Sequence, residues 1–169
     1  GYRVRPVIIA PERKKQLNDN LALFFTGFSR FSADIQTGTQ KAIGDKTAEL
    51  QEMKALVDEA EDILTDRSRD LDEFGRLLHH TWELKRGISA GISTDSIDGM
   101  YSRAREAGAL GGKLLGAGGG GFLLFYVTED RRSGLMEAMK DLLYIPFEFE
   151  NAGSTVIHYM PESYDPEIS

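Results

Sequence analysis

The amino-acid sequence predicts an α+β fold in which several helices cover a ferredoxin-like antiparallel sheet. Short apolar segments of strand length alternate with longer amphipathic segments of helical period. Their order is strand, helices, strand, strand, helix, strand, which matches a β-α-β-β-α-β scheme with an enlarged first crossover. With 169 residues, 41% of them hydrophobic, the chain has the size and composition of one globular domain.

The first elements follow from local composition. Residues 3–9 are rich in β-branched side chains and predict a strand, in which a proline favours an edge position. The polar segment Pro11–Asn20 predicts a short helix. The continuous apolar run 21–25, closed by a Thr-Gly pair, is typical of a buried strand. We expect a helix from Ser29 to Gly44, because its apolar residues recur at helical spacing.

Three amphipathic segments predict the helices that follow. Between Leu50 and Leu64, apolar residues recur every three or four positions. Asp70 is suited to cap a second helix that runs to Ile88. Ser93 or Thr94 is suited to cap a third, whose C-terminal stop we expect at Gly108.

The C-terminal third returns to strand character. We expect strands at 111–115 and 121–127, joined by a glycine run, then a helix around 135–143 and a strand around 145–149. A further strand at 154–159 is taken as the fourth strand of the sheet. We divide the chain into a connecting strand and helix at 1–20, the main domain at 21–160 and a frayed tail at 161–169.

Composition excludes several function classes. The net charge of -7 disfavours nucleic acid and anionic membranes as partners. Zero cysteines exclude disulfides and Cys-based metal sites, and three histidines leave little for a His metal cluster, so we expect no metal ligands in this chain. No apolar run approaches the ~18–20 residues of a membrane helix, and the N-terminus lacks the apolar core of a signal peptide, so we expect a cytoplasmic location.

Glycine is concentrated in one place. Eight of the 18 glycines lie between Gly108 and Gly121. Three explanations compete: a flexible connector, a tight turn that needs positive φ, and a loop whose bare amides approach an anion. Flexible connectors are usually Gly/Ser-rich and lie between domains, whereas this run joins two apolar strands within one. No Gly-Lys-Ser/Thr follows it and a strand rather than a helix comes next, which excludes a Walker A loop and a Rossmann turn.

The run Gly-Gly-Lys-Leu-Leu-Gly-Ala-Gly-Gly-Gly-Gly-Phe at 111–122 resembles the third signature motif of the GHMP kinase superfamily. The segments Leu-Phe-Phe-Thr-Gly at 23–27 and Trp-Glu-Leu-Lys-Arg at 82–86 resemble its D-glycero-D-manno-heptose 7-phosphate kinase branch. Leu115 and Phe122 depart from the Thr and Cys frequent in the mevalonate-type motif. The resemblance covers essentially the whole chain, as the C-terminal half of such an enzyme.

That resemblance implies a function for the whole enzyme. ATP would phosphorylate the anomeric hydroxyl of a heptose 7-phosphate, with Mg as the metal, for nucleotide-activated heptose and surface polysaccharide synthesis. The family's N-terminal half carries the ATP-phosphate loop, the acidic base and the metal ligands, and none of these motifs is found here. We therefore expect no catalytic residue in this chain and expect its own N-terminal kinase domain as a partner. The alternatives are a fucose-kinase-like or other GHMP small-molecule kinase, and a non-catalytic α+β ligand-binding or regulatory domain.

The candidate site residues follow from the same resemblance and from their surroundings. Lys85 falls within an apolar helical stripe, where a lysine needs a counter-charge; it is either a ligand for an anionic substrate or a snorkelling side chain. Ser29 is suited to cap a helix beside Arg30, and together they could bind the 7-phosphate, although a solvated arginine is the simpler alternative. Lys113 is assigned to substrate or phosphate contact, against an ordinary ion pair. The phosphate-binding loop is assigned to Gly116, Ala117, Gly118, Gly119 and Gly120.

The remaining distinctive side chains are expected to be structural. His79 and His80 are adjacent in a helix and point to different faces, so they cannot both hold one metal in the usual i, i+4 arrangement. Solvated or capping roles are expected for them. His158 lies in the last predicted strand without an obvious partner, and Trp82 is expected in the core, with stacking on a sugar or a base as the alternative.

Overall fold

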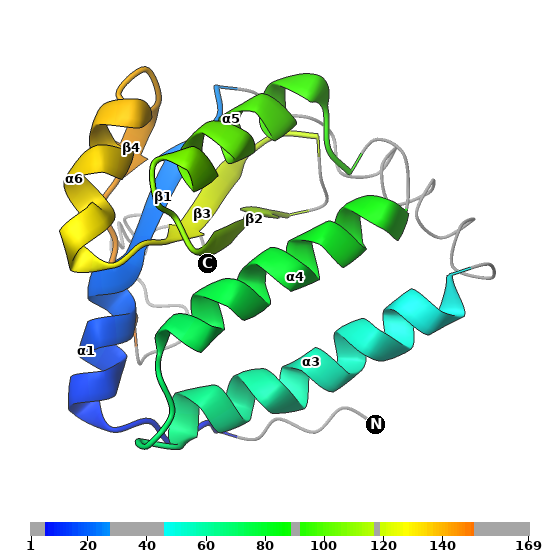
Figure 1. Ribbon diagram of the computed structural model, residues 1–169, viewed down its shortest axis with the longest axis vertical. Coiled ribbons are helices and arrows are strands. Elements are labelled where there is room, and N and C mark those ends of the chain that lie inside the picture. The colour runs from blue at the N-terminus through cyan, green and yellow to red at the C-terminus, as the bar shows by residue number, and fades with distance from the viewer. Residues whose placement is uncertain (1–5, 28–45, 89–91, 117–118, 151–169) are drawn as a thin grey trace, which may run out of the picture.

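A four-stranded antiparallel sheet forms the centre of the computed structural model, which describes residues 6–27, 46–88, 92–116 and 119–150 (Figure 1). The strand order is β2-β3-β1-β4. The strands are β1 (Leu21–Phe25), β2 (Gly111–Leu115), β3 (Phe122–Tyr126) and β4 (Leu143–Ile145). The helices are α1 (Pro11–Asn20), α3 (Thr47–Thr65), α4 (Asp72–Ile88), α5 (Asp95–Glu106) and α6 (Glu129–Ala138). This order and the antiparallel pairing confirm the predicted ferredoxin-like α+β fold.

The register places apolar side chains on both faces of the two central strands. Leu23 of β1 pairs with Leu124 of β3, and Leu124 pairs in turn with Lys113 of β2. Side chains alternate between faces along each strand, so neighbouring residues of β1 and β3 serve two different packing layers. The burial of both layers explains why these segments are continuous apolar runs.

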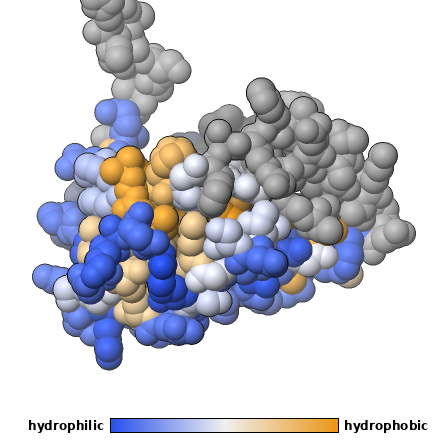
Figure 2. All heavy atoms as spheres, turned by 90° about the horizontal axis from the view of Figure 1, so that it is seen from above, coloured by the Kyte–Doolittle hydropathy of each residue, from blue (hydrophilic) through white to orange (hydrophobic). Residues whose placement is uncertain are grey.

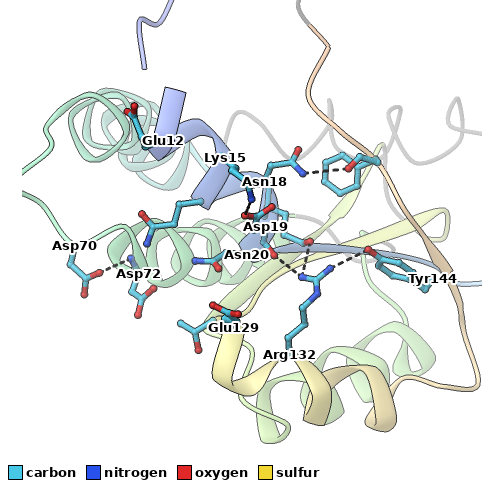
Figure 3. A pocket seen from close by; sticks show the side chains of 14 residues that line it. Glu12, Lys15, Asn18, Asp19, Asn20, Asp70, Asp72, Glu129, Arg132 and Tyr144 are labelled. Atoms are coloured by element: carbon cyan, nitrogen blue, oxygen red, sulfur yellow. Dashed lines mark hydrogen bonds and ion pairs between the residues drawn. The ribbon is translucent and has the colours of Figure 1, made fainter. Parts of the chain in front are cut away.

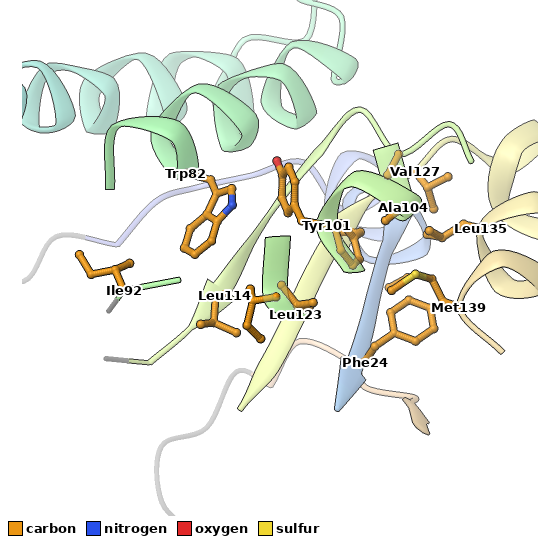
Figure 4. Close-up of a cluster of buried hydrophobic side chains, with 14 of the residues drawn as sticks. Phe24, Trp82, Ile92, Tyr101, Ala104, Leu114, Leu123, Val127, Leu135 and Met139 are labelled. Atoms are coloured by element: carbon orange, nitrogen blue, oxygen red, sulfur yellow. The ribbon is translucent and has the colours of Figure 1, made fainter. Parts of the chain in front are cut away.

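Two hydrophobic clusters cover the two faces of the sheet. The larger joins the sheet to α5, α6 and the second half of α4 (Figure 4), with Phe24, Trp82, Tyr101, Leu114, Leu123 and Phe125 among its members. The smaller joins α1, α3 and the first half of α4 to the other face, with Leu17, Leu21, Ile63, Leu71, Leu78 and Tyr126. Trp82 is 1% exposed, which confirms its expected place in the core.

Three predicted helix signals lie where the sequence placed them, whereas the helix expected around 135–143 lies earlier, as α6. An Oδ of Asp70 accepts a hydrogen bond from the Asp72 N–H at 3.0 Å, immediately before α4. The Thr94 hydroxyl accepts from the Ile97 N–H at 3.3 Å and caps α5. Gly108 follows the end of α5 with φ 104°, a left-handed conformation that glycine adopts without strain.

Two strand predictions need correction. In the first predicted strand, residues 6–10 are not part of the sheet and Ile8 is 84% exposed, while residues 3–5 lie outside the described ranges. Pro6 lacks an N–H, and the helix that begins at Pro11 leaves little extended chain to pair. The strand expected around 145–149 is β4, which lies earlier, at Leu143–Ile145, and pairs with β1. The segment 154–159, the helix expected between Ser29 and Gly44, and the tail lie outside the described residues.

Glycines allow α4 to lie directly on β2. A Cβ at Gly111 would come within 1.9 Å of the Gly75 carbonyl oxygen, and a Cβ at Gly75 within 2.6 Å of the Tyr126 ring. From Gly75, ten residues of helix at about 1.5 Å each reach Lys85, a span of about 15 Å. From Gly111, five residues of strand at about 3.3 Å each reach Gly116, about 16 Å away. This close contact therefore places Lys85 beside the start of the glycine run.

The described surface is mostly polar. Figure 2 shows one face on which hydrophilic residues surround a compact group of apolar ones. The large apolar side chains that remain exposed are Val7, Ile8, Val57, Phe122, Leu143 and Phe149. Within the described ranges, none of the helices combines the length and apolar character needed to cross a membrane.

Candidate functional site

The glycine run forms the connection between β2 and β3. Its described residues are 116 and 119–121. Gly116, Gly119 and Gly121 have φ values of 93°, 72° and 110°, in a region that side-chain-bearing residues rarely adopt. The glycines at these positions therefore serve the backbone conformation of the loop, in contrast to Gly111, which serves helix packing.

Hydrogen bonds hold the loop at several points. The Gly119 N–H donates to the Ile92 carbonyl at 3.0 Å, just before α5. The Gly121 N–H donates to the Thr26 hydroxyl at 3.1 Å, and the Thr26 N–H donates to the Gly121 carbonyl at 2.9 Å. These contacts join the loop to the end of β1 and to the start of α5. They argue against a flexible connector and leave the tight turn and the anion-binding loop as explanations.

Lys85 supplies a further hydrogen bond to the loop from the last turn of α4. Its Nζ donates to the Gly116 carbonyl at 3.0 Å. The side chain is half-buried, and burial, together with the nearby charge of Lys113, lowers the pKa of Lys85. The side chain therefore reaches a specific acceptor in the loop, 31 residues away in sequence, rather than extending into solvent.

Lys113 lies in β2, three residues before the loop, and is also half-buried. Within the described part of the chain, neither Lys113 nor Lys85 forms an ion pair with a carboxylate. Arg86, the residue next to Lys85, differs because it contacts Glu83 at 3.3 Å and Asp98 at 3.4 Å. Two unneutralised ammonium groups thus lie close together beside the glycine loop, in a protein whose net charge is negative.

The rest of the predicted site is described only in part. Ser29, Arg30, Ala117 and Gly118 lie outside the described residues. Among the assigned residues that are described, the structure brings together Lys85, Lys113 and the two ends of the loop. The hydrogen bond between Thr26 and Gly121 was not predicted. Thr26 directly follows an apolar strand, and that position was a signal that could have suggested the contact.

The two neighbouring histidines have structural partners. His79 Nδ1 lies 2.9 Å from the Tyr101 hydroxyl, and the two rings are stacked. Burial lowers the pKa of His79 and raises the pKa of Tyr101 to about 12. His80 Nε2 lies 2.7 Å from Glu52 on α3. The two rings therefore serve different contacts, as expected from their adjacent positions, while His158 lies outside the described residues.

A separate cavity of about 900 Å³ lies where β1 begins and β3 ends, away from the glycine loop (Figure 3). Five carboxylates line it: Glu12, Asp19, Asp70, Asp72 and Glu129. Of its two cations, Lys15 pairs with Asp19, and Arg132 donates to the backbone carbonyls of Asp19 and Leu21. The sequence does not reveal this cavity, because its residues come from four separate segments.

The described residues contain no group of three or more His, Asp or Glu side chains placed to hold a metal ion. The glycine loop and the two lysines, by contrast, are chemically suited to phosphate groups, which accept hydrogen bonds from backbone amides and attract ammonium ions.

The chain is similar to known kinases in sequence. It is 30% identical over 145 residues to the D-glycero-alpha-D-manno-heptose 7-phosphate kinase of Campylobacter jejuni, covering 82% of this chain and 42% of that enzyme. It is 34% identical over 94 residues to the mevalonate kinase of Pyrococcus horikoshii, covering 54% of this chain and 27% of that enzyme. The chain thus spans less than half the length of these relatives.

The fold and the family model agree with those similarities. The crystal structure of the Methanococcus jannaschii mevalonate kinase superimposes with a TM-score of 0.66 at 25% identity, over 81% of this chain and 42% of that one. The family model described as "GHMP kinases C terminal" matches residues 53–145, which include α4, α5, β2, β3 and the glycine loop. Because that match extends over more than half of its residues, the chain belongs to the GHMP kinase C-terminal family.

Proposed function

We propose that this chain is the C-terminal domain of an ATP-dependent sugar-phosphate kinase that phosphorylates the anomeric hydroxyl of D-glycero-D-manno-heptose 7-phosphate. The observation that carries the proposal is the tethered glycine loop beside Lys85 and Lys113, two cations without carboxylate partners among the described residues. Such a site attracts anions, and the phosphate groups of ATP and of the sugar phosphate in the proposed reaction are anions.

The chemistry of phosphoryl transfer suits a site of this kind. Negative charge is spread over the oxygens of the transferred group, and catalysis depends chiefly on positioning and on charge stabilisation. A loop that presents amides, next to two ammonium groups, would stabilise that charge without itself reacting. This chain therefore needs no nucleophile or base to contribute one wall of the active site.

Each assigned residue has a proposed role. The loop Gly116–Gly120 would contact phosphate oxygens of ATP or of the transferred group, and Lys85 and Lys113 would bind phosphate by charge. Ser29 and Arg30 would hold the 7-phosphate, which does not react. Magnesium would accompany ATP, with its ligands and the catalytic base supplied by the N-terminal kinase domain, as the family resemblance implies.

Two observations favour a sugar phosphate over mevalonate as the substrate. The similarity to the Campylobacter jejuni heptose kinase extends over 145 residues, against 94 for the Pyrococcus horikoshii mevalonate kinase. Leu115 and Phe122 also differ from the mevalonate-type motif, and the exposed Phe122 packs against Phe25 at the mouth of the loop. Leu115 and Phe122 are apolar, whereas the corresponding residues of the mevalonate-type motif are the polar Thr and Cys.

A substrate panel tests the proposal. The protein that carries this chain, with its N-terminal domain, is assayed with ATP and with heptose 7-phosphate, fucose, other sugars and mevalonate. We expect the highest kcat/KM with heptose 7-phosphate and no turnover by residues 1–169 alone. Highest activity on fucose or mevalonate would overturn the substrate assignment. No turnover by the whole protein would overturn the kinase proposal and favour a binding or regulatory domain. Robust turnover by this chain alone would show that the chain carries its own catalytic residues, and would overturn its proposed role as one wall of the active site.

A further inference from the structure

Gly116 is the first residue of the glycine loop, and its carbonyl is the acceptor of the Lys85 ammonium at 3.0 Å. A loop binds an anion through its N–H groups, so a carbonyl oxygen turned toward the same space would repel the anion. The Lys85 ammonium places a positive charge against that oxygen. Lys113, which lies three residues before the loop in sequence, forms no hydrogen bond to it among the described residues.

We propose that Lys85 is a positioning residue for the glycine loop: by holding the Gly116 carbonyl, it fixes the position of the loop where the chain leaves β2. This role is additional to the charge that Lys85 shares with Lys113. Its consequence for catalysis rests on the proposed kinase function, but its effect on loop order does not. An ammonium has three donors, so one bond to Gly116 leaves two that can face an anion.

The fold supports a fixed rather than an incidental contact. Lys85 lies on a helix whose position along β2 is set by direct contact of Gly75 with Gly111. The same helix buries Trp82 one turn earlier, which prevents rotation of this segment about its axis. The packing of α4 on β2 thus places the Lys85 side chain at Gly116, while the hydrogen bonds of Gly119 and Gly121 hold the other end of the loop.

Amide hydrogen exchange tests the effect on loop order. In the protein that carries this chain, exchange at Gly119 and Gly121 is compared with exchange at Phe125, a core amide of β3. We expect Lys85→Met to speed loop exchange about 10-fold relative to Phe125, and Lys113→Met to change it less than about 2-fold. Lys85→Arg should restore slow exchange, because arginine keeps a charged donor. If Lys85→Met unfolds the protein, Lys85→Gln, which keeps a neutral donor on a shorter stem, replaces it.

Kinetics test the consequence for the reaction. We expect Lys85→Met to lower kcat about 10-fold with phosphorylated and unphosphorylated sugars alike, because the loop is misplaced for both. Lys113→Met should instead raise KM with kcat retained. Loop exchange that stays slow in Lys85→Met, or equal effects of the two lysine variants, would overturn the positioning role. If the protein phosphorylates no sugar while Lys85→Met still speeds loop exchange, the kinase proposal fails and the positioning role stands.

Discussion

The two ends of the sheet carry opposite electrostatic environments. At the glycine-loop end, Lys85 and Lys113 lie close together without carboxylate partners among the described residues. At the other end, five carboxylates line a cavity of about 900 Å³ in which Lys15 and Arg132 are already engaged (Figure 3). The acidic cavity is therefore poorly suited to a phosphate, because an anion there would meet like charge.

The proposed site is therefore distinguished from the cavity by chemistry rather than by size. The loop end combines glycines of positive φ with two lysines that have no carboxylate partner among the described residues. Each of these features has a cost for folding, since glycine loses more backbone freedom than other residues and half-buried ammonium groups lose hydration. At the opposite end, by contrast, both cations already have partners: Lys15 pairs with Asp19, and Arg132 donates to the carbonyls of Asp19 and Leu21.

The largest effect should come from the loop itself. Gly119→Val should reduce kcat/KM at least about 100-fold, because a β-branched residue at φ 72° is strained and blocks the approach of phosphate. Because Gly119 is buried and valine is strained at its φ, the melting temperature should also fall, and activity is measured where circular dichroism shows the variant folded. Gly99→Ala in α5, where an added Cβ meets nothing within 4 Å, is the matched glycine control and should retain activity. Full activity in Gly119→Val would mean that the loop only connects two strands.

Gly111, a glycine of the same motif, should act chiefly on the stability of the fold. Gly111→Ala places a Cβ within 1.9 Å of the Gly75 carbonyl and 2.7 Å of the His79 nitrogen, so α4 must move away from β2. We expect a loss of about 3 kcal/mol in the free energy of unfolding, near the upper range of overpacking. Chemical denaturation measures it. An unchanged stability would show that α4 does not lie on β2 as described, which would also displace Lys85 from the loop.

The sequence predicted the strands, the helix caps and the loop because each depends on local pattern. An apolar run, a capping Asp70 and a glycine stop after α5 act over a few residues. Long-range placement was less accessible: the sequence marked Lys85 as unusual but could not identify Gly116 as its acceptor. That contact depends on how far α4 and β2 run side by side.

The fourth strand shows a second limit. The sequence predicted a strand around 145–149, but the short helix α6 returns the chain to the edge of β1 earlier, at Leu143–Ile145. Residues 6–9, also predicted as a strand, pair with no described strand, because β composition alone supplies no partner.

The acidic end can be perturbed without touching the loop. The Tyr126 hydroxyl accepts from Asn20 Nδ2 at 2.8 Å and donates to Asp72 at 3.1 Å, joining α1, β3 and α4. Tyr126→Phe leaves the buried Asn20 amide without this partner, and we expect a loss of about 2 kcal/mol in the free energy of unfolding. KM for the phosphorylated sugar should be unchanged. A raised KM at constant stability would indicate that the acidic cavity takes part in substrate binding.

Paired lysine variants compare the two ends directly. Lys113→Met should raise KM for a phosphorylated substrate about 10-fold, the value of one charge-assisted contact. Lys15→Met removes the same charge from the acidic end, where the side chain is exposed and paired with Asp19 at 2.5 Å. That variant should change KM less than about 2-fold. Equal effects of the two variants would show that only the net charge of the protein matters, and that the loop end has no special affinity for anions.

The smallest effect concerns pH. Burial and the charge of Lys113 lower the pKa of Lys85 below its ordinary value of 10.5, whereas the hydrogen bond to Asp19 raises the pKa of the exposed Lys15. Phosphate binding needs the charged ammonium, so affinity for inorganic phosphate should fall as pH rises through the lowered pKa of Lys85. This decline should begin below pH 10.5, and titration calorimetry can follow it.

Folding stability should change in the opposite direction over the same interval. Between the folded pKa of Lys85 and 10.5, the unfolded chain holds the proton more tightly than the folded one, so the free energy of unfolding rises with pH. Below the folded pKa, the full cost of burying the ammonium is present. Lys85→Met should flatten this rise, and Lys113→Met should move the decline in phosphate affinity toward higher pH by removing a like charge. If Lys113→Met leaves that pH dependence in place, the two ammonium groups do not interact, and the loop end lacks the paired cations that distinguish it from the acidic end.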